Sequence, residues 1–267
     1  MSLYMEYVGG LGDAILRLYF SGKLWYGALE KMGDLDRAVV ALMCHNSNLS
    51  EIFKWHPKRK HIGVLDFGFN MGFHPWENED WRVARGLPAE AICPPHAPAE
   101  TLTFYPSPED KPLLDALRGK KFIVMGATAS TDERTIPEPI RHECAREAIK
   151  RGFEVLVVGR SRYFHQKRQN DIPMAPGVID AVDRLSVPGT IEAIKLSAGA
   201  ICAHSAVLHM AWSERKPVFL LYNEWMKKNL LPHGAVGYMQ GINRDDTDHM
   251  EFSEYMPERI IAWVNQR

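Results

Sequence analysis

The sequence predicts an α/β protein with two doubly wound halves, on three observations. Short apolar runs of strand length alternate with segments of helical pattern, which is typical of parallel sheets covered by helices on both faces. Residues 87–112 hold seven of the seventeen prolines and separate the two series of runs. At 267 residues, the chain is long enough for two domains of ordinary size. We therefore expect residues 1–110 and 111–267 to form two Rossmann-like domains facing each other across a cleft.

The second half carries the clearer strand pattern. Its strand candidates are residues 121–127, 153–159, 178–182, 199–203 and 217–222, and its helix candidates are residues 139–151, 190–197 and 205–214. A terminal helix is expected within residues 252–267, with Ser253 before it and Ile260, Ile261 and Val264 on one side. This helix is expected to pack back onto the protein.

The first half repeats the theme more briefly. Its strand candidates are residues 4–8, 38–43 and 61–66, and its helices are expected from Asp13 onward and at residues 49–55. Proline removes a backbone donor, so residues 87–112 are interpreted as a linker. Ligands of open α/β sheets bind at the carboxyl ends of the strands, which places the expected site in the cleft.

The net charge and the spacing of the cysteines indicate which binding partners and which cellular compartment to expect. A net charge of -1 and a pI near 6.8 give no global attraction for nucleic acid or anionic lipid, so either contact would need a local patch. The four cysteines form no CxxC pair, and no run approaches the ~20 apolar residues of a membrane span. A cytoplasmic protein without a membrane span is expected.

The opening VGGLGDAILRL resembles a dinucleotide loop only in part. Gly10, Gly12 and Ile15 occupy the three positions where small residues are required, and Ile15 is bulky. Asp13 would also face the pyrophosphate. Two interpretations stay open for Asp13: an acid stabilised by the dipole of the helix it begins, or a general base aimed into the cleft.

Two later turns suit an anion. In GATASTDERTIP, residues 126–137, the hydroxyls of Thr128 and Ser130 and the Arg134 cation could hold a phosphate. A polar loop with capping hydroxyls is the alternative. Ser205 follows a strand and is a good helix cap, and the amides after it would also favour an anion.

His204 and His209 invite a metal interpretation, which we do not favour. If both lay on one helix, five positions would separate them by ~140°, so they could not share a face. We therefore expect no metal site, and an ordinary buried or surface histidine is the alternative for each.

A basic run with one aromatic residue, KWHPKRKH, covers residues 54–61. Most such runs are solvated surfaces, and contact with phosphates or nucleic acid is the alternative.

Taken in order, these motifs resemble the heptosyltransferase-like family of GT-B glycosyltransferases. The family's GD pair corresponds to Gly12-Asp13, and its GA strand end, with hydroxyls and a cation before proline, to residues 126–137. Its D-S/T-G-x-x-H-x-A turn corresponds to residues 204–211, and its G-K-P-V strand start to residues 215–218. Residues 54–57, before a strand expected to end at Asp66, resemble a further segment of the family.

The resemblance implies a GT-B fold and an inverting glycosyltransferase without an essential metal or cofactor. The second half would hold a nucleotide-diphosphate sugar. The first half would hold a hydroxyl acceptor, such as a saccharide of a surface polysaccharide or lipopolysaccharide. Peripheral membrane contact is compatible with such an acceptor.

The resemblance also assigns roles to residues. Asp13 would be the base, and Gly10 and Gly12 would leave clearance for the acceptor. The donor and its phosphates would be held by Ser130, Arg134, His204, Ser205, Ala206 and His209. Two departures matter, since His204 replaces the family's acid and Ala206 its glycine, and heptose cannot be inferred as the donor sugar.

Three alternatives stay open beside this hypothesis. The acceptor hydroxyl could belong to a nucleic-acid base, with the basic run contacting phosphates. The protein could be a nucleotide-binding relic of the fold without turnover. A dinucleotide-dependent oxidoreductase is the third, and Ile15 counts against it.

Overall fold

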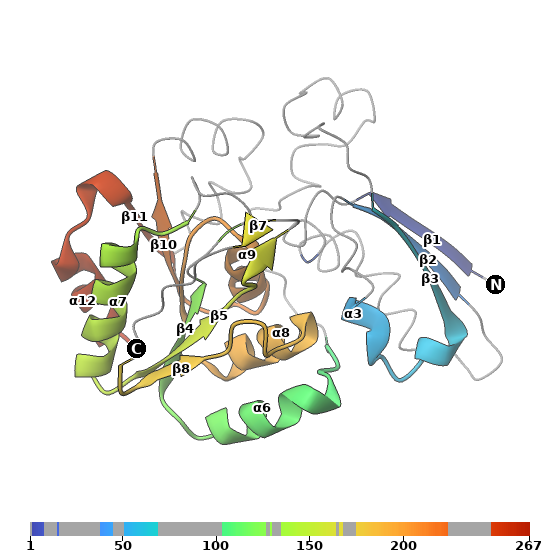
Figure 1. Ribbon diagram of the computed structural model, residues 1–267, viewed down its shortest axis with the longest axis horizontal. Coiled ribbons are helices and arrows are strands. Elements are labelled where there is room, and N and C mark those ends of the chain that lie inside the picture. Colours follow the sequence, from blue (N-terminus) through green and yellow to red (C-terminus); the bar gives the residue numbers. More distant parts are fainter. Residues whose placement is uncertain are drawn as a thin grey trace.

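A computed structural model describes the ranges on which the account below rests: residues 2–7, 15, 38–44, 51–68, 103–126, 129, 135–163, 166–167, 175–223 and 247–267. The first half contributes a three-stranded sheet and the second half a six-stranded sheet, and a short antiparallel pair joins β6 (Arg162–Tyr163) to β7 (Gln166–Lys167). Figure 1 shows the six-stranded sheet on the left of the molecule and the three-stranded sheet on the right. The expected α/β class is confirmed.

The six-stranded sheet has the order of a doubly wound dinucleotide fold. Its strands are β4 (Phe122–Gly126), β5 (Glu154–Val158), β8 (Val178–Asp180), β9 (Ala200–Cys202), β10 (Val218–Tyr222) and β11 (Thr247–Glu251). The order β11-β10-β9-β4-β5-β8 is parallel throughout, and it corresponds to 6-5-4-1-2-3 in chain order. The sequence pattern predicted the first five strands and missed β11.

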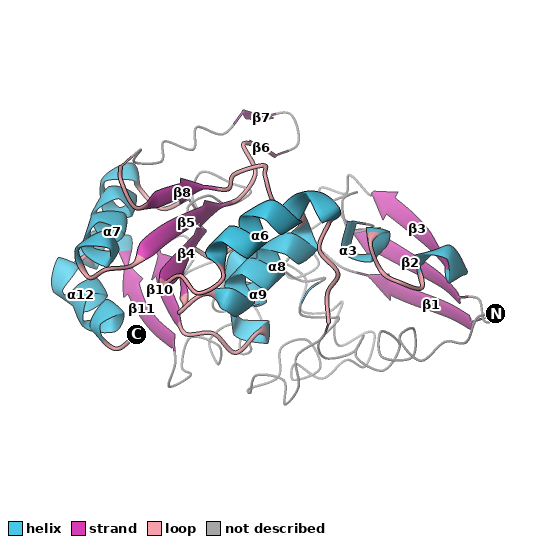
Figure 2. Cartoon of the chain, turned by 90° about the horizontal axis from the view of Figure 1, so that it is seen from below, coloured by secondary structure: helices cyan, strands magenta, loops and turns pink. Residues whose placement is uncertain are grey.

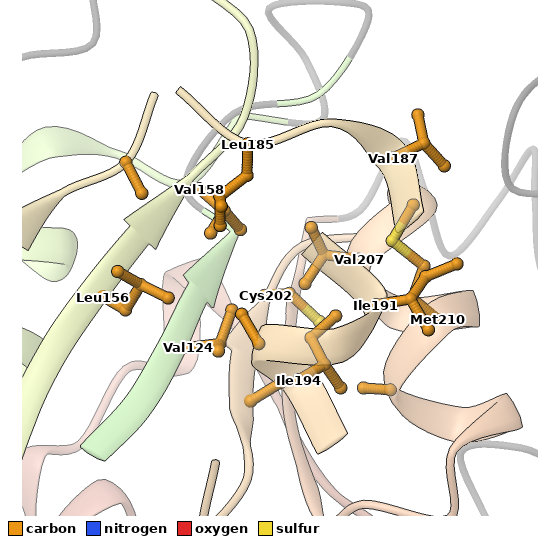
Figure 3. Close-up of a cluster of buried hydrophobic side chains, with 14 of the residues drawn as sticks. Val124, Leu156, Val158, Leu185, Val187, Ile191, Ile194, Cys202, Val207 and Met210 are labelled. Carbon is orange, nitrogen blue, oxygen red and sulfur yellow. The ribbon is translucent and has the colours of Figure 1, made fainter. Parts of the chain in front are cut away.

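Helices cover both faces of this sheet (Figure 2). One face carries α7 (Glu138–Lys150) and α12 (Pro257–Asn265), and the other carries α6 (Lys111–Leu117), α8 (Val187–Leu196) and α9 (Ala206–Ser213). Side chains of a strand alternate between faces, so Val124 packs toward α8 and α9 (Figure 3) while Ile123 packs toward α7. The apolar runs of the sequence are continuous because both faces are buried.

The three-stranded sheet runs in chain order and is also parallel. Its strands are β1 (Ser2–Tyr7), β2 (Ala38–Cys44) and β3 (Ile62–Gly68), and α3 (Glu51–Lys54) and the 3-10 turn η2 (Arg59–His61) lead into β3. Ile15, Ile52 and Phe53 are fully buried in the same apolar cluster as the residues of α8. The first half is therefore packed against the helical layer of the second.

The ends of several elements differ from the predictions. Helix α12 begins at Pro257, and Ser253 lies in a preceding 3-10 turn, η5 (Phe252–Glu254). Proline fits the first turn of a helix because its missing N–H is not needed there. Trp263 is buried with Ile260 and Val264, whereas Ile261 is only half-buried. Helix α8 begins at Val187 rather than at residue 190, because Ser186 caps it by accepting a hydrogen bond from the Gly189 amide at 3.0 Å.

A buried carboxylate ties the end of the proline-rich stretch to α8. Asp110 is 2% exposed and accepts hydrogen bonds from the Ser107 and Ser186 amides, both at 2.8 Å, and from the Ser186 hydroxyl. Phe104 packs farther along the same layer, beneath the Lys195 ammonium. The division at residue 110 stays a prediction, and these contacts fix residues 104–110 to the second half.

No helix within the described ranges is both long and apolar enough to cross a membrane.

Candidate functional site at the switch point of the six-stranded sheet

The strand order reverses between β4 and β9, which makes this the point where the sheet opens to a ligand. The chain leaves β4 toward β5 and β8 on one side, and leaves β9 toward β10 and β11 on the other. The two strands are in register up to their carboxyl ends, with Gly126 opposite Cys202. Connections that leave in opposite directions open a crevice at the carboxyl edge. The sequence motif of residues 126–137 begins at the end of β4, and that of residues 204–211 begins after the end of β9.

Gly126 allows α9 to approach the end of β4. A Cβ at this position would lie 2.8 Å from Cβ of Val207, closer than side-chain atoms approach one another. Val207 is in the first turn of α9 and belongs to the buried cluster drawn in Figure 3. The glycine that ends the β4 run therefore brings the N-terminus of α9 against the switch point.

Ser205 precedes α9 but does not cap it with its side chain, contrary to the sequence prediction. Its backbone is extended, with φ -147° and ψ 179°, and its hydroxyl makes no capping hydrogen bond. The Oγ atom is buried and has no hydrogen-bond partner within the described part of the chain. A helix N-terminus carries unpaired amides and a partial positive charge, so this hydroxyl and these amides together suit an anionic oxygen.

The two histidines of the turn meet, which corrects the sequence argument that separated them. His204 lies before α9 rather than on it, so the helical angle of ~140° does not apply. The rings pack edge to face with centroids 5.4 Å apart, and the residues are 6% and 5% exposed. His209 thus supports the turn through His204. Elsewhere in the described chain, no three His, Cys, Asp or Glu side chains gather as a metal would require.

Five of the sequence-predicted site residues lie outside the described residues: Gly10, Gly12, Asp13, Ser130 and Arg134. Two described residues, Ala129 and Thr135, flank Ser130 and Arg134 in the sequence. The Ala129 amide donates a long hydrogen bond of 3.5 Å to the Thr135 hydroxyl. Of the predicted set, the structure brings together His204, Ser205, Ala206 and His209.

Sequence reasoning missed a buried carboxylate at the other end of α9. The Glu214 side chain is 1% exposed, and its Oε2 lies 3.7 Å from Lys195 Nζ. Burial raises the pKa of Glu214 to about 8, and the nearby Lys216 lowers it in part. A perturbed carboxyl can mark a catalytic site, but α9 is eight residues long and separates Glu214 from Ser205 by about 13 Å along its axis. Glu214 is therefore a feature of the helical layer and not of the switch-point site.

No protein-family model and no curated protein sequence matches this chain. Its structure is similar to that of glycosyl transferase family 9 from Veillonella parvula, at 13% identity and a TM-score of 0.58, over 99% of this chain and 96% of that one. It is also similar to E. coli ADP-heptose LPS heptosyltransferase II, at 11% identity and a TM-score of 0.58, over 100% and 98% of the two chains.

A third similar structure is E. coli heptosyltransferase WaaC with ADP, at 10% identity and a TM-score of 0.58, over 100% and 99% of the two chains. At these identities the likeness concerns the fold. It extends over almost the full length of this chain and of each relative, and it bears out the fold class that the sequence motifs implied. The chain has the α/β GT-B fold of the heptosyltransferases.

Proposed function

We propose that this protein is a glycosyltransferase that moves a sugar from a nucleotide-diphosphate sugar to a hydroxyl acceptor. The observation that carries the proposal is the β9–α9 turn at the switch point, where a buried hydroxyl without a partner stands beside a helix N-terminus. Similar folds include heptosyltransferase WaaC, which was solved with ADP. A diphosphate is the group that such a turn recognises best.

The reaction is proposed to invert the anomeric carbon without an essential metal. The Asp13 carboxylate takes the proton of the acceptor hydroxyl, and the acceptor oxygen forms its bond to the anomeric carbon as the bond to the diphosphate breaks. Negative charge then grows on the leaving diphosphate. Preorganised donors stabilise such charge, and this role is assigned to the α9 amides, Ser205, Ser130 and Arg134.

The acceptor is proposed as a macromolecule in the cytoplasm. The family resemblance implies a saccharide of a surface polysaccharide or lipopolysaccharide. A hydroxyl on a nucleic acid is the second candidate, and the basic surface described below favours it.

A thermal-shift panel of nucleoside diphosphates and nucleotide sugars tests the donor. A ligand that binds only the folded protein stabilises it by ~2.7 kcal/mol at about 100 times its Kd, so at least one member should raise the midpoint clearly. Dinucleotides such as NAD should not. A panel without any response would overturn the proposal, and a response to NAD alone would favour an oxidoreductase.

Asp13→Asn tests the base. The variant should retain the donor-induced shift and lose transfer by a factor of at least 10². Equal transfer in the variant and the parent would remove Asp13 from the mechanism. Intact donor binding without transfer in the parent protein would indicate a nucleotide-binding relic.

A further inference from the structure

A dense group of cations lies where the first half enters β3. We define the basic cluster as Lys54, Lys58, Arg59 and Lys60, of which Lys58 is half-buried and the others are exposed. Lys54 ends α3 and stands over the ring of Trp55 at 5.1 Å, and Arg59 and Lys60 lie in η2. Four cations thus lie within seven consecutive residues.

Few acids lie close to the cluster in the sequence. Glu51 is the only acid between residues 51 and 60, and its carboxylate is bound by Arg160 of the second half at 3.1 Å. Among the residues that the structure describes, Lys54, Lys58 and Lys60 have no ion pair. In a protein of net charge -1, this is a local positive field that suits a polyanion.

The cluster lies beside the three-stranded sheet of the first half, whereas the donor site is proposed at the six-stranded sheet of the second half. Arg59 and Lys60 immediately precede β3, so they lie at the amino edge of the parallel three-stranded sheet. Figure 1 labels β3 and the neighbouring α3. β3 has seven residues, so its two ends are ~20 Å apart. A ligand that touches the cluster and also reaches the carboxyl edge must extend over this distance, as a polymer does.

The cluster fits a nucleic acid better than a membrane. Stable attachment to a bilayer needs a buried apolar group as well as cations, but Ile52 and Phe53 of α3 face the core. Trp55 is half-buried beneath Lys54. A phosphodiester chain needs only closely spaced cations, because binding is driven by the release of its condensed counterions.

We propose that the basic cluster binds the phosphate backbone of a nucleic acid. Resting on the proposed function, this polymer is the class of acceptor that presents the hydroxyl for transfer. The binding step itself requires no donor, and it is measured without one.

The test uses fluorescence anisotropy of a labelled duplex of about 20 base pairs, titrated with the full-length protein at several salt concentrations. The variant carries Lys54→Gln, Lys58→Gln and Lys60→Gln. The matched control carries Lys111→Gln, Lys120→Gln and Lys121→Gln, which change net charge equally at exposed positions of the second half.

The cluster variant should lose at least tenfold in affinity, and its slope of log K against log salt should be shallower by ~2.7, the value for three phosphate contacts. The control should bind as the parent does, and replacement of the same three lysines by arginine should retain binding. Both triple variants should keep the parent's thermal midpoint and its response to the nucleotide panel.

Equal losses of affinity in the cluster variant and the control would overturn the inference. Absence of duplex binding by the parent protein would overturn it as well. If the protein binds vesicles with 30% anionic lipid but not the duplex, the partner of the cluster is a membrane surface, and the nucleic-acid inference fails. A response to the nucleotide panel without duplex binding would leave the donor proposal standing while this inference fails.

Discussion

The two parallel sheets differ in what their strand order can build. The six-stranded sheet reverses direction between β4 and β9, whereas the described part of the three-stranded sheet runs β1-β2-β3 in chain order without a reversal. Only a reversal sends neighbouring connections apart and opens a crevice at the carboxyl edge. The backbone of the second half therefore forms the geometry of a binding site. The described first half instead packs against the helical layer of the second half and carries the basic cluster at the amino edge of its sheet.

Three buried titratable groups of the described residues extend this comparison. Asp110 and Glu214 contact the helical layer of the second half, whereas His56 belongs to the first half and packs against Tyr105. The predictions below use these groups to separate the two halves, from the largest expected effect to the smallest.

Asp110→Ala should destabilise the second half by about 3 kcal/mol. The substitution leaves the buried Ser107 amide and the part-buried Ser186 amide without the acceptor that now lies 2.8 Å away, and each orphaned donor is costly. Urea unfolding measures the loss. Asp115→Ala removes an exposed acid of α6 and is the control, for which a much smaller loss is expected because exposed ion pairs contribute little to stability. Similar values for the two variants would show that Asp110 does not hold the stretch to α8.

Glu214→Gln should become more stabilising as the pH rises. Burial raises the pKa of Glu214 from 4.5 to about 8, so the folded state holds a proton that the unfolded state releases between these values. Stability is therefore lost as pH rises through this window, at up to ~1.4 kcal/mol per pH unit. Chemical unfolding of both proteins at pH 5, 6.5 and 8 measures the difference. A constant difference would mean that Lys195 keeps the carboxylate ionised throughout.

His56 should give the opposite dependence. Burial lowers the pKa of His56, and Lys58 lowers it further, so the unfolded state binds a proton that the folded state resists. Stability is complete above the unfolded pKa of ~6.5 and is lost as the pH falls below it, until the ring of the folded state is protonated as well. The neutral ring accepts the Lys58 amide at 3.1 Å through Nδ1. His56→Asn should remove this acid sensitivity, and an unchanged profile in the variant would contradict the assignment.

Ser205→Ala should have the smallest effect on stability. Loss of a capping serine usually costs about 1 kcal/mol, but this hydroxyl caps nothing and is buried without a partner. A change below about 0.5 kcal/mol is expected, together with weaker binding of nucleoside diphosphates. Thermal unfolding with and without ligand measures both. A loss of 1 kcal/mol or more without ligand would show that Ser205 is an ordinary cap.

Periodicity and turn residues predicted most of the sheets, because strands buried on both faces have continuous apolar sequences. The register that pairs Gly126 with Cys202 is a tertiary property and was not predictable. Strand β11, Thr247–Glu251, was not predicted because its sequence TDHME holds one apolar residue among polar ones, a pattern that also occurs in loops. The helix at Lys111–Leu117 was missed since prolines mask its start.

The candidate site was predicted in part. Gly126 ends β4 and Ser205 precedes α9, so the two predicted turns begin at strand ends, where glycine and serine are common. The roles of their residues stay predictions. The sequence could not predict that Ser205 makes no capping hydrogen bond. Serine occurs both as a helix cap and as a ligand-binding residue, and the sequence does not distinguish the two. The histidine pair was misjudged because the helix was assumed to include His204.

The most direct test of the donor site is Ala206→Asp at the first position of α9. An acid at a helix N-terminus leaves the free protein as stable as before or slightly more so, but it repels a diphosphate bound there. Ala206→Asn is the neutral control of the same shape. With the nucleoside diphosphate most effective in the panel, the asparagine variant should keep most of its thermal shift and the aspartate variant should lose it. Equal shifts in the two variants would contradict a diphosphate site at the β9–α9 turn.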